Sequence, residues 1–241
     1  MSTLIVELKK EKRTGIILML CMVGILGAMY IFANFILRKD SLLTLPMNPM
    51  DILLTQLYGV IMILNMFGIV VATTIIYYIE FNGNAIQKMY ILPIRISGVY
   101  FCKFVILTVA FFVAIVLQNI SLFIIGVTEL PQGAFEIGIW IRFAGYSFIT
   151  SMPVLAIMLF VSSRFQNIWV PLGIGVGGFL SGMALGTVKS KLFFINPFVV
   201  MIKPAVAMSS QPEMIVVIIA LVETLFFLFL GLLRGEQIAY E

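Results

Sequence analysis

Six long apolar runs, separated by short polar connections, are the feature of this sequence that most limits its fold. A helix needs about 20 mostly apolar residues to cross a hydrocarbon core roughly 30 Å thick. The predicted spans are 15–37, 52–79, 99–127, 141–163, 168–186 and 214–233. One soluble core could not bury them, because 62% of the 241 residues are hydrophobic and only 11% are charged. The chain is therefore predicted to lie in a bilayer.

The runs predict helices rather than strands. Strands of membrane barrels alternate apolar and polar residues over about 10 positions, whereas these runs are apolar on every face. The expected fold is an all-α integral membrane protein with one transmembrane domain over 1–241. The first run is too long for the apolar core of a signal peptide, so we expect a retained span. Segment 1–14, with Leu4, Ile5 and Leu8 opposite its charges, predicts an interfacial helix along the inner leaflet.

The basic residues predict which side each connection faces. Cytoplasmic connections carry an excess of Lys and Arg, and the densest basic cluster precedes the first span. With six spans, both termini are then cytoplasmic. The inner side receives Lys9, Lys10, Lys12, Arg13, Lys88, Arg95, Lys103, Arg164 and Arg234, and the outer side receives Arg38, Lys39, Arg142, Lys189, Lys191 and Lys203. The net charge of +4 thus reflects topology, and no nucleic-acid partner is expected.

Several classes of catalysis lack their reagents. There is no histidine, which excludes Ser-His pairs, HExxH zinc sites and histidine relays. The two aspartates, Asp40 and Asp51, lie outside the spans, and no Gly-Lys dipeptide exists to form a P-loop. Cys21 and Cys102 sit in or beside apolar runs and leave their redox state open. We expect no catalytic residue and no metal site, which leaves transport, anchoring or assembly.

The stretch from Tyr77 to Arg95 interrupts this apolar pattern on the predicted cytoplasmic side. Apolar residues recur at helical spacing, with polar residues facing away, and predict a short amphipathic helix over 81–92. Asn84 is a candidate cap, and Pro93 ends the helix. So short a helix needs a support, either the headgroup boundary or a groove in a soluble partner. Periodicity leaves both open.

The same stretch resembles the first cytoplasmic loop of type-2 ABC exporter permeases. Glu80 ends the second span, Leu92-Pro93-Ile94-Arg95 follows the helix, and Lys103 enters the third span. The basic N-terminal segment, the six spans and Asn196-Pro197-Phe198 before the last span fit the same pattern. The motif Tyr-Ile-Leu-Pro-Ile most resembles the corresponding sequence in permease subunits of lantibiotic immunity and related peptide-antibiotic resistance transporters.

This resemblance implies that the loop helix is a coupling helix held in a cleft of a separate ATPase subunit. ATP and Mg would then be bound by that partner rather than by this chain. It also implies a second permease subunit, identical or diverged, and the bacterial cytoplasmic membrane as location. The residues carried over to coupling are Glu80, Asn84, Gln87, Lys88, Leu92, Pro93, Ile94 and Arg95.

Small residues form bare faces on two of the predicted spans. One face comprises Gly175, Gly178, Gly182 and Gly186, and a weaker one comprises Gly24 and Ala28. Small residues let helix backbones approach closely in lipid. Packing within the chain and a subunit interface explain the pattern equally well, and the resemblance favours the interface.

Glu223 lies near the middle of the sixth predicted span. An ionised acid there costs on the order of 2.5 to 3.5 kcal/mol, so the side chain should face protein or water. It is a candidate contact on the transport path. The alternative is a structural role for a neutral acid bonded to a neighbouring Ser, Thr or Asn.

Segment 189–205, interrupted by Pro197, is too short to cross and predicts an outer interfacial or re-entrant segment.

The resemblance implies a permease subunit that expels lantibiotic-type antimicrobial peptides from the membrane. Such amphipathic cargo is already bound to lipid and needs a lateral apolar surface. Another hydrophobic cargo, such as a lipid or small antibiotic, is the related alternative. A proton-coupled secondary transporter working through Glu223 and a non-transporting anchor or assembly factor are the alternatives from other classes.

Overall fold

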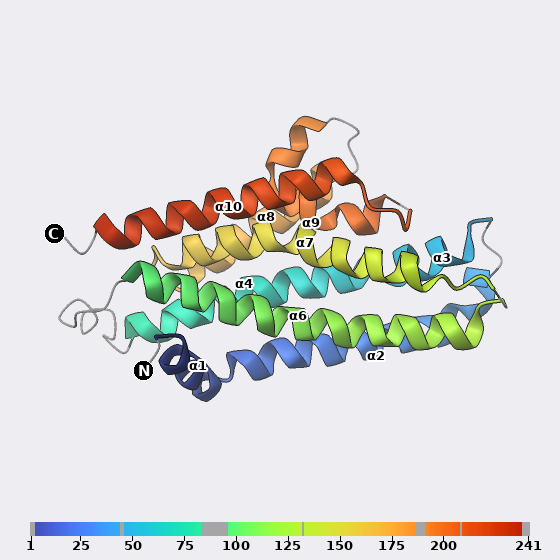
Figure 1. The fold of residues 1–241 in the computed structure, drawn as a ribbon, viewed down its shortest axis with the longest axis horizontal. Coiled ribbons are helices and arrows are strands. Elements are labelled where there is room, and N and C mark those ends of the chain that lie inside the picture. The colour runs from blue at the N-terminus through green and yellow to red at the C-terminus, as the bar shows by residue number, and fades with distance from the viewer. Residues whose placement is uncertain are drawn as a thin grey trace.

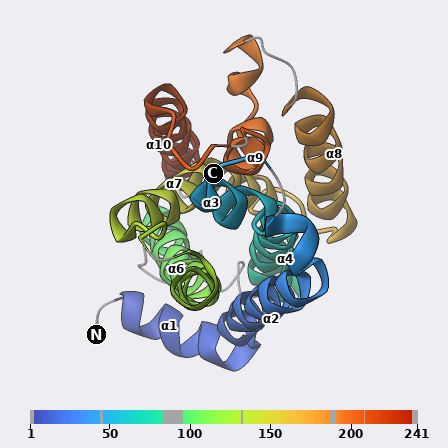
Figure 2. The same cartoon turned by 90° about the vertical axis from the view of Figure 1, so that its right-hand side faces the viewer.

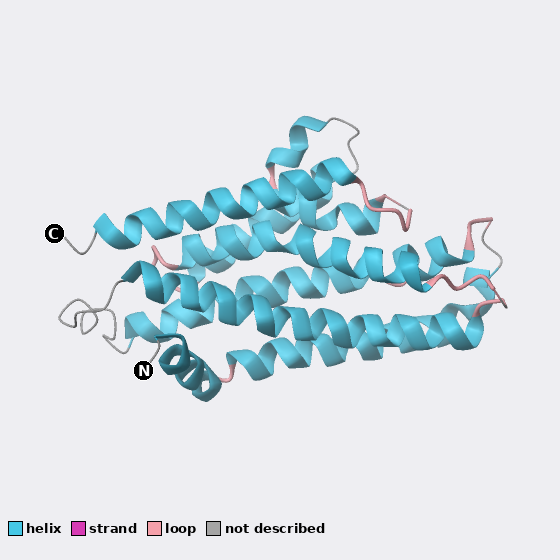
Figure 3. Ribbon diagram, in the orientation of Figure 1, coloured by secondary structure: helices cyan, strands magenta, loops and turns pink. Residues whose placement is uncertain are grey.

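Long helices lying side by side make up the computed structural model of this chain (Figure 1). The structure describes residues 3–43, 46–82, 96–131, 133–186, 191–207 and 209–237, and this part of the chain contains no strand (Figure 3). Six of its helical segments are long and apolar enough to cross a membrane. They are α2 (Ile16–Leu43), α4 (Gly59–Asn82, continuing α3, Pro49–Asp51, and a π-helical turn, Ile52–Gln56), α6 (Ile96–Glu129), α7 (Ile137–Ser162), α8 (Trp169–Gly186) and α10 (Met214–Gln237).

The predicted spans match these helices, with differences at the ends. The largest extension is that of α2, which continues past residue 37 through Arg38, Lys39 and Asp40. These three charged residues are exposed, so they can remain in water while the helix continues. Helix α6 has 34 residues and is about 51 Å long, which exceeds the roughly 30 Å thickness of the hydrocarbon core.

Helix α1 (Thr3–Thr14) lies across the end of the bundle and contacts α2 and α6 (Figures 1 and 2). Gly15 joins α1 to α2 with φ of 77°, a left-handed conformation that glycine adopts without strain. The start of α1 and the end of α10 lie at the same end of the bundle (Figure 1). This end is the one that the basic residues predict to be cytoplasmic, and it is called the cytoplasmic end below.

Helices α4 and α6 are joined by a buried amide pair, which also contacts α2 through the Val23 carbonyl. Asn65 Nδ2 donates to Gln118 Oε1 at 3.0 Å, and Gln118 Nε2 donates back to Asn65 Oδ1 at 2.7 Å. Gln118 fits against α2 because residue 27 is glycine, where a Cβ would lie 2.6 Å from Gln118 Nε2. Similarly, a Cβ at Gly24 would lie 2.7 Å from the Cα of Ala114. The small face of α2 that contains Gly24 and Ala28 therefore lies toward α6 of the same chain at Gly24.

The glycine face of α8 also packs within the chain. A Cβ at Gly175 would overlap Val70 of α4, and one at Gly178 would overlap the ring of Phe198. A Cβ at Gly182 would lie 2.8 Å from Ile202 Cδ1, and one at Gly186 would be in ordinary contact with the same side chain. This arrangement is the intrachain packing that the sequence left open. A subunit interface through these four glycines would require α8 to leave α4 and α9.

The segment before the last span is more deeply buried than an interfacial position would give. A 3₁₀ turn (Lys191–Ile195) leads to α9 (Pro197–Val206), in which Val200 and Met201 are fully buried. Pro197 separates the 3₁₀ turn from α9 and begins that helix. Asn196 caps it by accepting a bond from the Phe198 N–H at 3.0 Å. Helix α9 contacts α7 and α8.

Candidate coupling site at the cytoplasmic end

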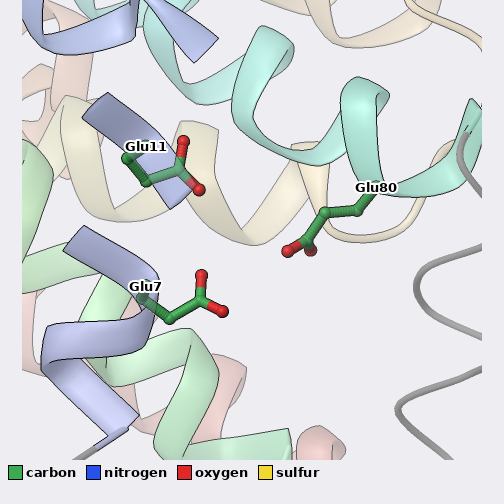
Figure 4. A group of neighbouring side chains, drawn as sticks. All are labelled: Glu7, Glu11 and Glu80. Carbon is green, nitrogen blue, oxygen red and sulfur yellow. The ribbon is translucent and has the colours of Figure 1, made fainter. Parts of the chain in front are cut away.

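Helix α1 turns its two acidic residues into the protein. Glu7 and Glu11 are one helical turn apart, so both lie on one face, and they are 4% and 1% exposed. Figure 4 shows their carboxylates pointing toward that of Glu80, which comes from the last turn of α4 and is 2% exposed. Three acidic side chains from two distant segments therefore meet in a buried space.

The ammonium group of Lys103 lies between these carboxylates. Lys103 Nζ is 3.1 Å from Glu7 Oε2, 3.2 Å from Glu11 Oε1 and 2.8 Å from Glu80 Oε1. Its side chain, from the second turn of α6, is fully buried and also lies 5.5 Å from the centroid of the Tyr77 ring. Each acid thus receives a direct ion pair, which offsets the cost of removing it from water.

Lys10 supplies the second positive charge. It forms an ion pair with Glu80 and lies 3.6 Å from Glu7 Oε1, and its side chain remains 28% exposed. We call Glu7, Lys10, Glu11, Glu80 and Lys103 the ion-pair cluster. It connects α1, the end of α4 and the beginning of α6.

The spacing of the three carboxylates alone would also suit a metal ion. One oxygen from each of Glu7, Glu11 and Glu80 lies within 4.8 Å of the others. However, the Lys103 ammonium lies within hydrogen-bond distance of all three, so the group has its cation from the chain itself. The three carboxylates and Lys103 therefore form an internal ion-pair network.

The ion-pair cluster lies at both stems of the predicted coupling loop. Helix α4 ends at Asn82, two residues after Glu80, and α6 begins at Ile96, seven residues before Lys103. The first two residues of the predicted 81–92 helix are the end of α4, and residues 83–95 lie outside the described part of the chain. The roles of Asn84, Gln87, Lys88, Leu92, Pro93, Ile94 and Arg95 therefore stay predictions.

Sequence reasoning located Glu80 and Lys103 but missed their partners on α1. Two signals were present. Glu7 and Glu11 share a face that excludes Lys9, Lys12 and Arg13, and Lys103 is a charge inside a predicted span, which requires a partner. The inner-leaflet interpretation of segment 1–14 described only the exposed side of this helix.

Glu223 lies apart from the ion-pair cluster, in the middle of α10. Its side chain is half-buried, and its Oε2 atom is buried without a hydrogen-bond partner among the described residues. No described lysine or arginine forms an ion pair with it. Its role on a transport path stays a prediction.

The fold defines a class: a multi-pass, α-helical membrane protein in which the buried ion pairs of the described residues join α1 to the end of α4 and the beginning of α6. Residues 3–182, well over half of the chain, match the family model described as ABC-2 family transporter protein, and the chain belongs to this family. None of the curated proteins and none of the solved structures matches it. Family membership makes the chain a membrane permease subunit of an ABC transporter, with an ABC ATPase as partner and a second permease subunit. In bacteria, its location is the cytoplasmic membrane.

Proposed function

We propose that this permease expels lantibiotic-type antimicrobial peptides from the membrane, driven by ATP and Mg bound to its separate ATPase subunit. The observation that carries the coupling mechanism is the ion-pair cluster. It joins the end of α4 and the beginning of α6 to α1, so a displacement of the segment between them would be passed to three helices together. In this mechanism the ATPase holds the 81–92 segment, and Glu80 and Lys103 transmit its movement to α4 and α6.

Two features of the opposite end and of the bundle surface support amphipathic cargo. Figure 2 shows α8 and α10 on the outside of the bundle, and α10 exposes Ile218, Val222 and Leu225 by more than 60% each. Near the predicted outer end, a hollow of about 630 Å³ lies between α7 and the connection from α9 to α10. Its lining combines Arg142 and Tyr146 with apolar Met214. An apolar side surface beside a partly polar hollow suits a ligand that arrives from the lipid.

Coupling is tested by separating docking from transmission. The chain is co-expressed with candidate ATPase subunits, and complex formation is measured by co-purification. Replacing Leu92 and Arg95 with Ala is expected to dissolve the complex. Glu80→Gln is expected to keep the complex and to uncouple ATP hydrolysis from export. A complex that survives the first change, or full export by E80Q, would contradict the mechanism.

Cargo is tested by the survival of cells that express the intact complex. We expect protection against a lantibiotic such as nisin and none against a small hydrophobic antibiotic. Protection only against the small antibiotic, or lipid export without peptide protection, would transfer the same mechanism to the alternative cargo. Export by the permease without any ATPase subunit would refute ATP-driven transport.

A further inference from the structure

The outward side of α1 has a composition that its inward side does not share. Because Glu7 and Glu11 point into the bundle, the outward side keeps Lys9, Lys12 and Arg13, all exposed. These three form no ion pair with any described carboxylate. Three of the four cations of α1 thus lie away from its two acidic residues, and the fourth, Lys10, pairs with Glu7 and Glu80.

Exposed apolar side chains accompany these cations. Leu4, Ile5 and Leu8 are 39%, 43% and 44% exposed, although α1 is at the end of a bundle with ample apolar area. Leucine and isoleucine side chains in this position are favourable when they enter the headgroup and acyl boundary of a leaflet. Helix α1 also lies across the bundle rather than along it, which is the orientation of an interfacial helix (Figure 1).

A hollow opens between the basic side of α1 and the end of α4. Its volume is about 1070 Å³, and its described lining comprises Val6, Lys9, Lys10, Lys12, Arg13, Thr14 and Ile79. This group, called the basic hollow, includes four cations and no carboxylate among its described residues. Ile79, from α4, adds an apolar wall and is 37% exposed.

We propose that the basic hollow binds the headgroup of an anionic phospholipid from the inner leaflet. Phosphate oxygens would accept hydrogen bonds from Lys9, Lys12 and the guanidinium group of Arg13, which suits phosphate geometry. The acyl chains would run along Ile79 and the exposed apolar side chains of α1. Charge complementarity favours this occupant over a zwitterionic lipid, and the apolar flank favours it over a soluble phosphate.

The lipid and the ion-pair cluster would then hold α1 from its two sides. The cluster fixes the acidic face to α6 and α4, and the headgroup neutralises the basic face. This proposal does not depend on the cargo, because it concerns only the inner-leaflet end of the permease.

The test measures lipid binding to the purified, delipidated full chain in detergent, with native mass spectrometry as the readout. Dioleoyl phosphatidylglycerol is expected to bind more tightly than dioleoyl phosphatidylcholine. Each of Lys9→Gln, Lys12→Gln and Arg13→Gln should lower the phosphatidylglycerol affinity about fivefold, the usual contribution of one basic residue near an anionic surface. Arg38→Gln, an exposed cation at the other end of α2, is the matched control and should change nothing.

A charge-preserving variant guards against loss of folding as an explanation. Lys9→Arg with Lys12→Arg should retain the affinity that the Gln variants lose. A triple variant replaces Lys9, Lys12 and Arg13 with Gln together. Equal affinity of the wild type for both lipids, or an unchanged phosphatidylglycerol affinity in this triple Gln variant, would overturn the proposal. So would a triple Gln variant that retains phosphatidylglycerol and instead loses the ATPase subunit, because the surface would then bind protein.

Discussion

Lys103 Nζ lies 2.8 Å from Glu80 Oε1, and both side chains are withdrawn from solvent. Glu80 lies in the last turn of α4, and Lys103 lies in the second turn of α6. Their ion pair holds the end of α4 against the beginning of α6. Glu7 and Glu11 extend this contact to α1. The end of α4 and the beginning of α6 can therefore move independently of α1 only if a buried ion pair breaks. Breaking such a pair is energetically costly.

Removing the central cation should destabilise the protein strongly. Lys103→Met leaves three buried carboxylates with only Lys10 near them, and breaking a buried pair on one side costs about 3 to 5 kcal/mol. Thermal unfolding in detergent should show the loss. Lys203→Met is the matched control, since Lys203 pairs with half-exposed Glu213 at 3.6 Å, and its loss should cost less than about 1 kcal/mol. Equal effects of the two substitutions would show that the cluster is not a stabilising contact.

Releasing α1 should be detectable without unfolding the bundle. Glu7→Gln combined with Glu11→Gln removes two of the ion pairs that Lys103 forms. Hydrogen exchange of the α1 amides should accelerate by about tenfold or more, because each charged bond contributes roughly 1.5 to 3 kcal/mol. Exchange in α9, which the cluster does not touch, should remain as in the wild type. Unchanged exchange in α1 would mean that other contacts hold this helix.

The amide pair between α4 and α6 should behave as a unit. Asn65→Leu leaves the buried Gln118 amide without its reciprocal partner, at a cost of about 1 to 3 kcal/mol. Adding Gln118→Leu should restore part of that loss, because no unpaired amide remains. The four free energies of unfolding form a double-mutant cycle. Strictly additive changes would contradict the pairing.

Adjacent glycines of α8 should differ sharply in their tolerance to a side chain. Gly178→Leu would drive its side chain into the Phe198 ring, whereas a Cβ at Gly177 meets nothing within 4 Å. The first substitution should cost about 1 to 3 kcal/mol and the second much less. If Gly177→Leu were instead the one to separate two permease subunits, the subunit contact would lie beside the glycine face rather than on it.

A charge-dependent role of Glu223 in transport predicts a functional defect in a stable variant. Glu223→Gln preserves shape, so expression and ATPase binding should be unchanged. Protection against a cationic peptide should fall by about tenfold, the loss expected when a charged hydrogen-bonding partner is removed. Full protection would assign Glu223 a structural role.

The spans were predictable because bilayer thickness fixes the length of an apolar helix independently of its neighbours. The partners of Lys103 were not, because helical spacing places Glu7 and Glu11 on one face without saying what that face meets. The same reason applies to α8, where the sequence revealed a bare glycine face but not that Val70 and Phe198 fill it. The break at Pro197 was predictable, but the helix that begins there was not, because its start depends on the Asn196 cap.

The reciprocal bond between Asn65 and Gln118 has a consequence for biosynthesis. The two residues are 53 positions apart and lie on different spans, so Asn65 enters the bilayer before Gln118 does. The Asn65 amide of the second span has no hydrogen-bond partner from Gln118 until the third span is inserted. Packing of the second span therefore depends on insertion of the third. If the gene is split within codons 83–95, the two fragments should accordingly associate in the membrane through the hydrogen bonds between Asn65 and Gln118.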